Sequence, residues 1–308
     1  MAIKILISDK IESVCPAILK EAGFEVDEKS GLSPADLEAV IGDYDGQIVR
    51  SATKVTEEVL KKGKAGKLKI VGRAGAGVDN IDTKAAEALG IKVVNTPGLN
   101  SNAVAELAVA FMFVLSRNLG PAIGSMKEGR WEKKALSRGF ELSGKTVGLV
   151  GYGSIGSLVA KKALGLGMKV LAFDPLVSDD KMKSEGVTPS TLENLFKESD
   201  HVSLHLPKNK DTLNLVNGSV LKTFKKTACL VNCARGGLVD EKALFEALKN
   251  GDLAGAAFDV FAEEPPTDNA LRSLPNFVSA PHLGASTVEA QLGVAKKVAE
   301  LLVEHLKK

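Results

Sequence analysis

One stretch of the chain, residues 146–174, constrains the fold more than any other. It joins a strand, a glycine turn, a helix and a second strand in fewer than thirty residues. An apolar, β-rich run leads directly into the three glycines of a GxGxxG turn, Gly151, Gly153 and Gly156. The first glycine allows the sharp turn, the second lets a pyrophosphate approach the backbone, and the third lets the helix lie close on the strand. The stretch predicts a dinucleotide-binding unit whose phosphates face the helix N-terminus.

The acid at the end of this unit indicates which dinucleotide binds. The second strand, predicted over Lys169–Phe173, ends at Asp174, 18 residues past Gly156. A carboxylate there accepts from both adenosine ribose hydroxyls and repels a 2′-phosphate, and no Arg or Lys follows before Lys181. A lone glycine turn also occurs for packing alone, but the strand, helix and acid at these distances favour NAD over NADP.

Length and composition exclude several classes of protein. With 308 residues and 44% hydrophobic content, the chain is long enough for two domains with their own cores. Its 40 basic and 38 acidic residues nearly balance and form no basic block, which argues against a nucleic-acid partner. The one candidate membrane span, Ala103–Leu115, is too short and contains Glu106, so it predicts a buried helix.

The N-terminus and the cysteines favour a cytoplasmic protein. No secretory signal pattern follows Met1, and three sparse cysteines fit a reducing compartment without disulfides. Cys229 and Cys233 fall in a predicted strand without a nearby His, so we expect no metal site there.

Strands and helices alternate along the whole chain. In the first hundred residues the apolar runs predict strands at Lys4–Ser8, Glu25–Glu28, Gln47–Arg50, Leu68–Gly72 and Lys92–Asn95. Beyond the glycine unit they predict strands at His201–Leu206, Cys229–Cys233, Ala256–Phe261 and Phe277–Ala280. This alternation of strands and helices predicts an α/β protein with two doubly wound parallel-sheet domains and an interdomain cleft. The first would be a flavodoxin-like substrate domain and the second a Rossmann NAD-binding domain with six or seven strands.

The expected domain boundary lies at Pro97 and Gly98, which interrupt the alternation of strands and helices. A long apolar helix then runs from Asn102 to about Asn118. We assign residues 1–98 plus 285–308 to a discontinuous substrate-binding domain and residues 99–284 to the NAD-binding domain.

Two further segments carry specific expectations. The segment Ser125–Lys134 holds the only Trp and four basic residues and is typical of a solvated, basic helical face. The last segment, Thr287–Lys308, predicts an amphipathic helix that packs back onto the first domain. Its apolar side would present Leu292, Val298, Leu301 and Leu302.

Two loops of the first domain carry arginine directly after a strand, where open parallel sheets bind ligands. They are Arg50–Lys54 and Arg73–Gly77. Arg50 or Lys54 suits a phosphate, and the amides from Gly75 to Gly77 suit a carboxylate. A solvated side chain is the simpler interpretation for Lys54 alone. The loops together predict a small anionic substrate.

Three polar residues follow strands of the second domain and are expected to converge, because neighbouring strand ends open onto one crevice. They are Arg235, Glu264 and His282. The Arg235 fork suits the carboxylate of a 2-oxo or 2-hydroxy acid. The His282 imidazole can exchange the hydroxyl proton while hydride moves, and Glu264 would hold its second nitrogen and favour its charged form.

Alternatives to this triad remain open. Glu264 stands among Glu263, Pro265 and Pro266 and also fits a surface turn. His205, at another strand end, is a rival base, whereas His201 and His305 are interpreted as structural or exposed.

Seven motifs, in order along nearly the whole chain, resemble the D-isomer-specific 2-hydroxyacid dehydrogenases. They are VRSATKVT, VGRAGAGVDNID, NTPGLNSNAVAELA, GKTVGLVGYGSIG, VNCARGGLVDEKAL, AFDVFAEEP and APHLGAST. The first three narrow the resemblance to a branch whose substrate carries a phosphate. The resemblance implies NAD-dependent oxidation of such a D-2-hydroxy acid by Arg235, Glu264 and His282.

The resemblance also implies a larger set of binding residues. Besides Gly151, Gly153 and Gly156, the residues expected to contact NAD are Ser154, Ile155, Asp174, Leu206, Pro207, Cys233, Ala234, Arg235, Asp259, His282, Gly284 and Ala285. The residues expected to meet the substrate are Arg50, Ser51, Arg73, Gly75, Ala76, Gly77 and Asn100, with Lys133 reaching a neighbouring subunit's site. Ala76 stands where some members of the family have a residue with a side-chain hydroxyl.

Three further expectations concern assembly, regulation and rival functions. The apolar helix at 103–115 suggests a homodimer that buries it. Long members of the branch carry a regulatory domain after the final helix; since this sequence ends at Lys308, we expect no feedback inhibition through such a domain. The rivals are a glyoxylate or hydroxypyruvate reductase, in which the Arg50 loop reads no phosphate, and an NAD-sensing corepressor-like binding protein.

Overall fold

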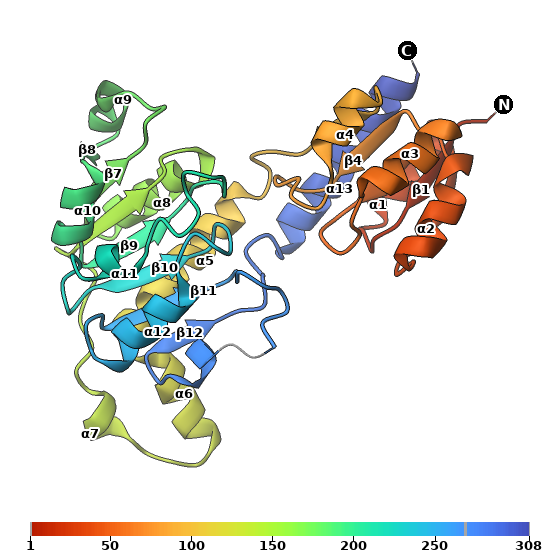
Figure 1. The fold of residues 1–308 in the computed structure, drawn as a ribbon. Coiled ribbons are helices and arrows are strands. Elements are labelled where there is room, and N and C mark those ends of the chain that lie inside the picture. Colours follow the sequence, from red (N-terminus) through yellow and green to blue (C-terminus); the bar gives the residue numbers. More distant parts are fainter. Residues whose placement is uncertain (1, 268–269, 308) are drawn as a thin grey trace. The chain divides into compact units, whose positions relative to one another are not determined.

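The chain forms two compact units in a computed structural model that describes residues 2–267 and 270–307. Unit 1 contains Met1–Asn100 and Ala285–Lys308, and unit 2 contains Ser101–Gly284 (Figure 1). Met1 and Lys308, at the ends of the predicted substrate-binding domain, lie outside the described residues.

Unit 1 has a five-stranded sheet in the order β2-β1-β3-β4-β5, in which all pairs are parallel. Its strands are β1 (Lys4–Ile7), β2 (Glu25–Glu28), β3 (Gly46–Val49), β4 (Ile70–Arg73) and β5 (Lys92–Asn95). This is the flavodoxin-like order, so the predicted fold class of this unit is confirmed.

Helices cover both faces of this sheet because successive strand residues point to opposite sides. Ile5 and Ile7 of β1 belong to one buried cluster and Leu6 belongs to the other. Two helices, α1 (Val14–Glu21) and α13 (Val288–Leu306), pack together over the first cluster. The second cluster is covered by α2 (Pro34–Val40), η1 (Ile41–Asp43), α3 (Glu57–Ala65) and α4 (Thr83–Ala88).

Unit 2 has a seven-stranded parallel sheet in the order β12-β11-β10-β9-β6-β7-β8. Its strands are β6 (Thr146–Val150), β7 (Lys169–Phe173), β8 (Thr188–Pro189), β9 (His201–Leu204), β10 (Cys229–Asn232), β11 (Gly255–Phe258) and β12 (Phe277–Ser279). The order reverses between β6 and β9, which makes the sheet doubly wound, as predicted. The two-residue strand β8 has too short an apolar pattern to be predicted.

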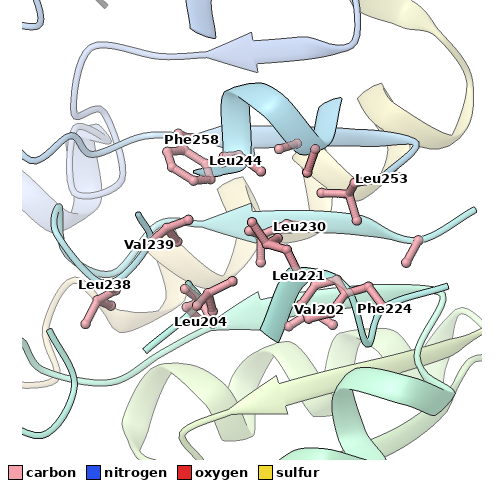
Figure 2. Packing of buried hydrophobic residues seen from close by; sticks show 14 of the residues in the cluster. Val202, Leu204, Leu221, Phe224, Leu230, Leu238, Val239, Leu244, Leu253 and Phe258 are labelled. Carbon is pink, nitrogen blue, oxygen red and sulfur yellow. The ribbon is translucent and has the colours of Figure 1, made fainter. Parts of the chain in front are cut away.

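The helices of unit 2 form layers on both faces of its sheet. They are α5 (Ser101–Ser116), α6 (Leu119–Lys127), α7 (Lys133–Leu136), α8 (Ser154–Gly165), α9 (Asp179–Ser184), α10 (Leu192–Glu198), α11 (Gly218–Leu221), α12 (Glu241–Lys249) and η2 (Ala270–Ser273). Figure 2 shows one core, where Leu230 and Phe258 of the sheet pack with Leu221 and Leu244 of the helices. Each such buried side chain contributes about 1.5–3 kcal/mol relative to exposure. On the other face, α5 and α8 pack together.

Some details differ from the prediction. The segment Ser125–Lys134 is not one helix: α6 ends at Lys127 and α7 begins at Lys133, and between them Gly129 adopts a φ of 75°. The final helix buries Val298 and Leu302 fully, but Leu292 is 44% exposed, because it points to a different side of the helix from the buried stripe.

The apolar helix predicted at 103–115 corresponds to α5, which buries one face in its own unit through Ala105, Ala108 and Met112. Within residues 2–267 and 270–307, no single helix is long and apolar enough to cross a membrane. Together α5 and α6 pass that test, but the chain bends by 72° between them.

Candidate functional site

The glycine turn between β6 and α8 has the geometry that a dinucleotide needs. Gly151 has a φ of 100°, and a Cβ there would lie 2.3 Å from the carbonyl oxygen of His205. A Cβ on Gly156 would lie 2.2 Å from the carbonyl oxygen of Gly151, so the helix lies close against the strand end. A Cβ on Gly153 would meet no atom within 4 Å. The turn is therefore closed toward the protein and open at its middle glycine, where a pyrophosphate can approach.

The first turn of α8 and the end of β7 complete this surface. Gly153 is the N-cap of α8 and offers no side chain to its amides; Ser154 is exposed, whereas Ile155 packs against the core. The Asp174 carboxylate accepts from the amides of Tyr152 (2.7 Å) and Leu176 (2.9 Å). These bonds fix the carboxylate beside the glycine turn. A helix N-terminus without a side-chain cap and an oriented acid fit the diphosphate and ribose of NAD.

His282 and Glu264 form a hydrogen-bonded pair, with 2.7 Å between Nδ1 of His282 and Oε2 of Glu264. This bond is the main cause of a raised pKa of His282, while burial opposes it. Burial acts to raise the pKa of Glu264, but the hydrogen bonds from His282 and from the amide of Phe261 (3.0 Å) outweigh it and the pKa falls. The pair therefore favours a carboxylate beside an imidazole that readily takes a proton.

Asp259 shapes the backbone that carries His282. Asp259 is buried, and its carboxylate accepts from the amides of Leu283 (2.6 Å) and Gly284 (2.7 Å). Its carbonyl accepts from the His282 amide at 2.9 Å, and His282 has a φ of 56°. Burial raises the pKa of Asp259, while the two amides act in the opposite direction. The Asp259 carboxylate is thus committed to the chain's own loop, and it positions His282.

Arg235 lies on a loop that buried Asn232 organises. The Asn232 side chain donates to the carbonyl of Arg235 (2.9 Å) and accepts from the amide of Ala234 (3.1 Å). Arg235, Glu264 and His282 follow β10, β11 and β12, which are neighbours in the sheet, so the three residues lie at one edge of it. The positive charge of Arg235 contributes to lowering the pKa of both Glu264 and His282. A Cβ on Gly236, the residue after Arg235, would lie 1.7 Å from the carbonyl oxygen of Phe261. The Arg235 loop therefore packs closely against the loop that carries Glu264.

The rival histidines have other surroundings. Burial lowers the pKa of His205 to about 3, and its Nε2 lies 2.9 Å from Oγ of Ser203, so the ring is neutral at physiological pH. His201 is buried, pairs with Ser116 at 3.0 Å and has a pKa lowered by burial to about 4. It also lies opposite Cys229 in the strand register, so the expectation that no His lies near that cysteine is wrong.

In unit 1, the loop that begins with Arg50 is held from two sides. The Asp9 carboxylate accepts from the amide of Arg50 (2.6 Å) and from the hydroxyl of Thr53 (2.7 Å). The Asn80 side-chain amide donates to the carbonyls of Arg50 (2.8 Å) and Thr53 (2.6 Å). Ser51 is exposed, and Nη1 of Arg50 lies 3.4 Å from the carbonyl oxygen of Lys10. The loop therefore has a defined shape at the C-terminal edge of the sheet.

The second arginine loop is also ordered by its own chain. The Gly75 amide donates to the carbonyl of Arg73 at 2.9 Å, so it is already engaged. The carbonyl of Ala76 accepts from the side chain of Asn95 at 2.6 Å. The amides of Ala76 and Gly77 have no hydrogen-bond partner in the described part of the chain. These two amides, rather than that of Gly75, are the donors left for a carboxylate.

The remaining predicted residues occupy varied surroundings. Asn100 ends unit 1, and its Oδ1 has no hydrogen-bond partner in the described part of the chain. Lys133 is exposed on α7. Four more residues follow strands of unit 2, with Pro207 exposed, Leu206 half-buried, and Cys233 and Ala234 buried. Ala285 begins the second segment of unit 1.

Sequence reasoning missed the residues that act through backbone hydrogen bonds. Asp9, Asn80 and Asn232 each connect or organise the loops that carry predicted site residues. For Asp9 and Asn232 the only signal in the sequence is a small polar residue at or just beyond a strand end, whereas Asn80 lies farther along the loop after β4. Such residues are common in ordinary turns.

More than half of the chain matches a known sequence family. Residues 109–284 match the family model described as D-isomer specific 2-hydroxyacid dehydrogenase, NAD binding domain. The match includes the glycine turn, Asp174 and the predicted triad.

Individual proteins give a consistent result. The chain is 48% identical to the D-3-phosphoglycerate dehydrogenase of Synechocystis sp., over 98% of this chain and 54% of that protein. The chain spans about half the length of the curated relatives it matches. The solved structure of the TT0316 protein from Thermus thermophilus is 35% identical, with a TM-score of 0.88 over 98% of this chain and 97% of that one. D-lactate dehydrogenase from Aquifex aeolicus, complexed with NAD and lactic acid, is 27% identical, with a TM-score of 0.86 over 98% and 95% of the two chains.

Proposed function

Because the chain belongs to the D-isomer specific 2-hydroxyacid dehydrogenases, we propose that it oxidises 3-phospho-D-glycerate reversibly to 3-phosphooxypyruvate with NAD. This reaction would be the first step of phosphorylated L-serine biosynthesis. The observation that carries the proposal is the 2.7 Å contact between His282 and Glu264 at the sheet edge where Arg235 also lies. The match to D-3-phosphoglycerate dehydrogenases over nearly the whole chain supports the choice of substrate.

The proposed acid–base chemistry follows from the tautomer that Glu264 selects. Its carboxylate accepts a hydrogen bond from Nδ1 of His282, which leaves Nε2 to take the proton of the substrate's C2 hydroxyl. NAD, when bound, accepts the hydride from C2. The proton thus stays on the imidazole, and the Glu264 carboxylate stabilises the imidazolium that forms. In the reverse direction the same imidazolium returns the proton to the carbonyl oxygen.

Each unit has charged or polar groups that would suit one part of the substrate. The Arg235 guanidinium would form two parallel hydrogen bonds to the substrate carboxylate and so fix C2 relative to His282. In unit 1, Arg50 and Ser51 would bind the phosphate, and Arg73 and the Ala76–Gly77 amides would bind further substrate oxygens. Asn100 is a further candidate for a substrate contact.

A steady-state assay with a panel of substrates and both cofactors tests this proposal. We expect 3-phosphoglycerate, or 3-phosphooxypyruvate in reverse, to give a higher kcat/KM than glyoxylate, hydroxypyruvate or pyruvate, and NAD(H) to be preferred over NADP(H). If the phosphorylated compounds turn over no better than the others, the substrate assignment fails while the enzyme class survives.

The principal alternative is a glyoxylate or hydroxypyruvate reductase, for which Arg50 would have no phosphate to bind. Arg50→Ala separates the two: it should erase the preference for the phosphorylated substrate in the first case and change little in the second. A corepressor-like, NAD-sensing binding protein is a further alternative, and turnover at the rate of ordinary dehydrogenases would argue against it.

We further propose that the protein is a cytoplasmic homodimer. Several large apolar side chains on and near α5, α6 and α7 are exposed within the single chain: Phe113, Leu119, Ile123, Met126 and Trp131. Exposed apolar patches of this kind mark contact surfaces in many proteins. A dimer through this surface would also bring Lys133 close to a second copy. Sedimentation at micromolar concentration tests it, and a monomer there would contradict it.

A further inference from the structure

The loop at residues 50–53 is closed into a fixed shape by two side chains from elsewhere in unit 1. Asp9 follows β1, and Asn80 belongs to the loop after β4. Both side chains contact the two ends of the same four-residue loop, at Arg50 and at Thr53. The Asp9 carboxylate accepts hydrogen bonds from the loop, and the Asn80 side-chain amide donates hydrogen bonds to it.

The contacts of Asp9 engage its whole carboxylate. Oδ2 accepts from the amides of Arg50 (2.6 Å) and Thr53 (3.2 Å), and Oδ1 accepts from the amide (3.1 Å) and the hydroxyl (2.7 Å) of Thr53. Asp9 is only 8% exposed. Buried carboxylates are costly unless they are hydrogen-bonded, so this one maintains the loop geometry that satisfies it.

The contacts of Asn80 are complementary. Its single Nδ2 donates to the carbonyls of Arg50 (2.8 Å) and Thr53 (2.6 Å) and so fixes the distance between the loop ends. A loop whose ends are held by both donors and acceptors loses little entropy when a ligand binds to it. Neither side chain engages the exposed Ser51 or the Arg50 guanidinium, whose Nη1 donates to the carbonyl of Lys10 at 3.4 Å. These are the groups assigned to the substrate phosphate.

We infer that Asp9 and Asn80 are positioning residues that hold the 50–53 loop in the shape that recognises the substrate's phosphate, and so set the preference for a phosphorylated substrate. This inference rests on the proposed function. The negative charge of Asp9 would weaken phosphate binding if it faced the phosphate. Instead, its carboxylate accepts four hydrogen bonds from Arg50 and Thr53 of the loop.

The test compares two substrates that differ only in the phosphate, 3-phosphooxypyruvate and hydroxypyruvate, with NADH. In Asp9→Asn, one oxygen becomes an N–H donor that faces amide donors of the loop, so the loop ends separate. We expect kcat/KM for 3-phosphooxypyruvate to fall on the order of tenfold, chiefly through KM, while that for hydroxypyruvate changes little. Asn80→Ala should act in the same direction.

The chain offers a matched control at the opposite end of the same sheet. Asp45 is also buried and also accepts a backbone amide, that of Lys4 at 3.0 Å, but it precedes β3 instead of following a strand. Asp45→Asn should therefore leave the ratio of the two kcat/KM values unchanged. If Asp9→Asn does not fold, Thr53→Val removes the 2.7 Å bond and keeps the buried acid.

The outcomes separate this inference from the proposed function. A wild-type protein that does not prefer 3-phosphooxypyruvate overturns both. A wild-type protein with that preference, and variants that keep the same ratio or lose activity equally on both substrates, overturn the positioning role alone. A selective loss on the phosphorylated substrate in the folded variants supports it.

Discussion

Nδ1 of His282 lies 2.7 Å from Oε2 of Glu264, and this bond joins two loops of unit 2 that are separated by 18 residues in the sequence. Because Nδ1 is bonded to Glu264, Nε2 is the imidazole nitrogen left to exchange a proton with a substrate. It also raises the pKa of the ring that would exchange a proton with the substrate. Proton transfer and its pH dependence therefore depend on the same contact.

Glu264→Gln should shift the pH profile of oxidation to lower pH. The hydrogen bond and charge of Glu264 raise the pKa of His282, and glutamine keeps an acceptor without the charge, so that pKa should fall. Oxidation needs the neutral imidazole, and its rate therefore rises as pH increases through the pKa of His282. In the variant this rise should occur at lower pH, and in the reductive direction the loss of rate should also begin at lower pH. Glu263→Gln, on the neighbouring exposed side chain, is the control; identical profiles in wild type and Glu264→Gln would contradict the assignment.

The parts of this site that were predictable are those that a local pattern determines. The glycine turn needs its residues at fixed spacings, and strand ends carry Arg235 and His282 to one edge of a parallel sheet whatever the details of packing. The contact between Glu264 and His282 was predicted as one of two alternatives, because a carboxylate between prolines also suits a surface turn. The observed hydrogen bond distinguishes them.

What could not be predicted depends on tertiary contacts. Asp9 and Thr53 are 44 residues apart, and nothing local indicates that the carboxylate of one accepts from the other. The carboxylate of Asp259 accepts from the amides of Leu283 and Gly284, and no local pattern indicates this contact beside the cofactor contact expected of the residue. Likewise, Leu292 has the right residue type for a buried stripe, and only the packing of α13 shows that it lies outside it.

Two glycine substitutions should separate folding from cofactor binding. In Gly153→Ala the new methyl group meets no protein atom within 4 Å, so stability should be nearly unchanged, while the affinity for NADH should fall because the methyl occupies the approach of the pyrophosphate. In Gly151→Ala, the φ of 100° and the 2.3 Å approach to His205 should destabilise the fold by about 1–3 kcal/mol. Thermal unfolding and NADH fluorescence titration measure both; full NADH affinity in Gly153→Ala would contradict the assigned role.

Asp174→Asn should weaken the discrimination against NADP. The substitution keeps one acceptor oxygen and removes the charge that repels a 2′-phosphate. We expect the ratio of kcat/KM values for NADP and NAD to rise by about tenfold, which corresponds to about 1.4 kcal/mol. Asp179→Asn, an exposed acid at the start of α9, is the control and should leave the ratio unchanged. An unchanged ratio in Asp174→Asn would show that another group excludes the phosphate.

Arg235→Lys should impair substrate binding although the charge is retained. Lysine cannot form two parallel hydrogen bonds to a carboxylate, and one charge-assisted bond contributes about 1.5–3 kcal/mol. We expect kcat/KM to fall by roughly tenfold to a hundredfold, with NADH affinity close to wild type. Arg272→Lys, in η2 of the same unit, serves as the control. Equal losses in substrate and NADH binding would indicate a general effect on the sheet edge.

The most direct test of the account is the kcat of His282→Gln with 3-phosphoglycerate and NAD, measured together with the affinity for NADH. Glutamine can hydrogen-bond but cannot exchange a proton, and general acid–base catalysis typically contributes about 10²–10⁴-fold. The account predicts a loss of kcat in that range with the NADH affinity retained. A kcat near that of the wild type would contradict the central claim that His282 carries the proton.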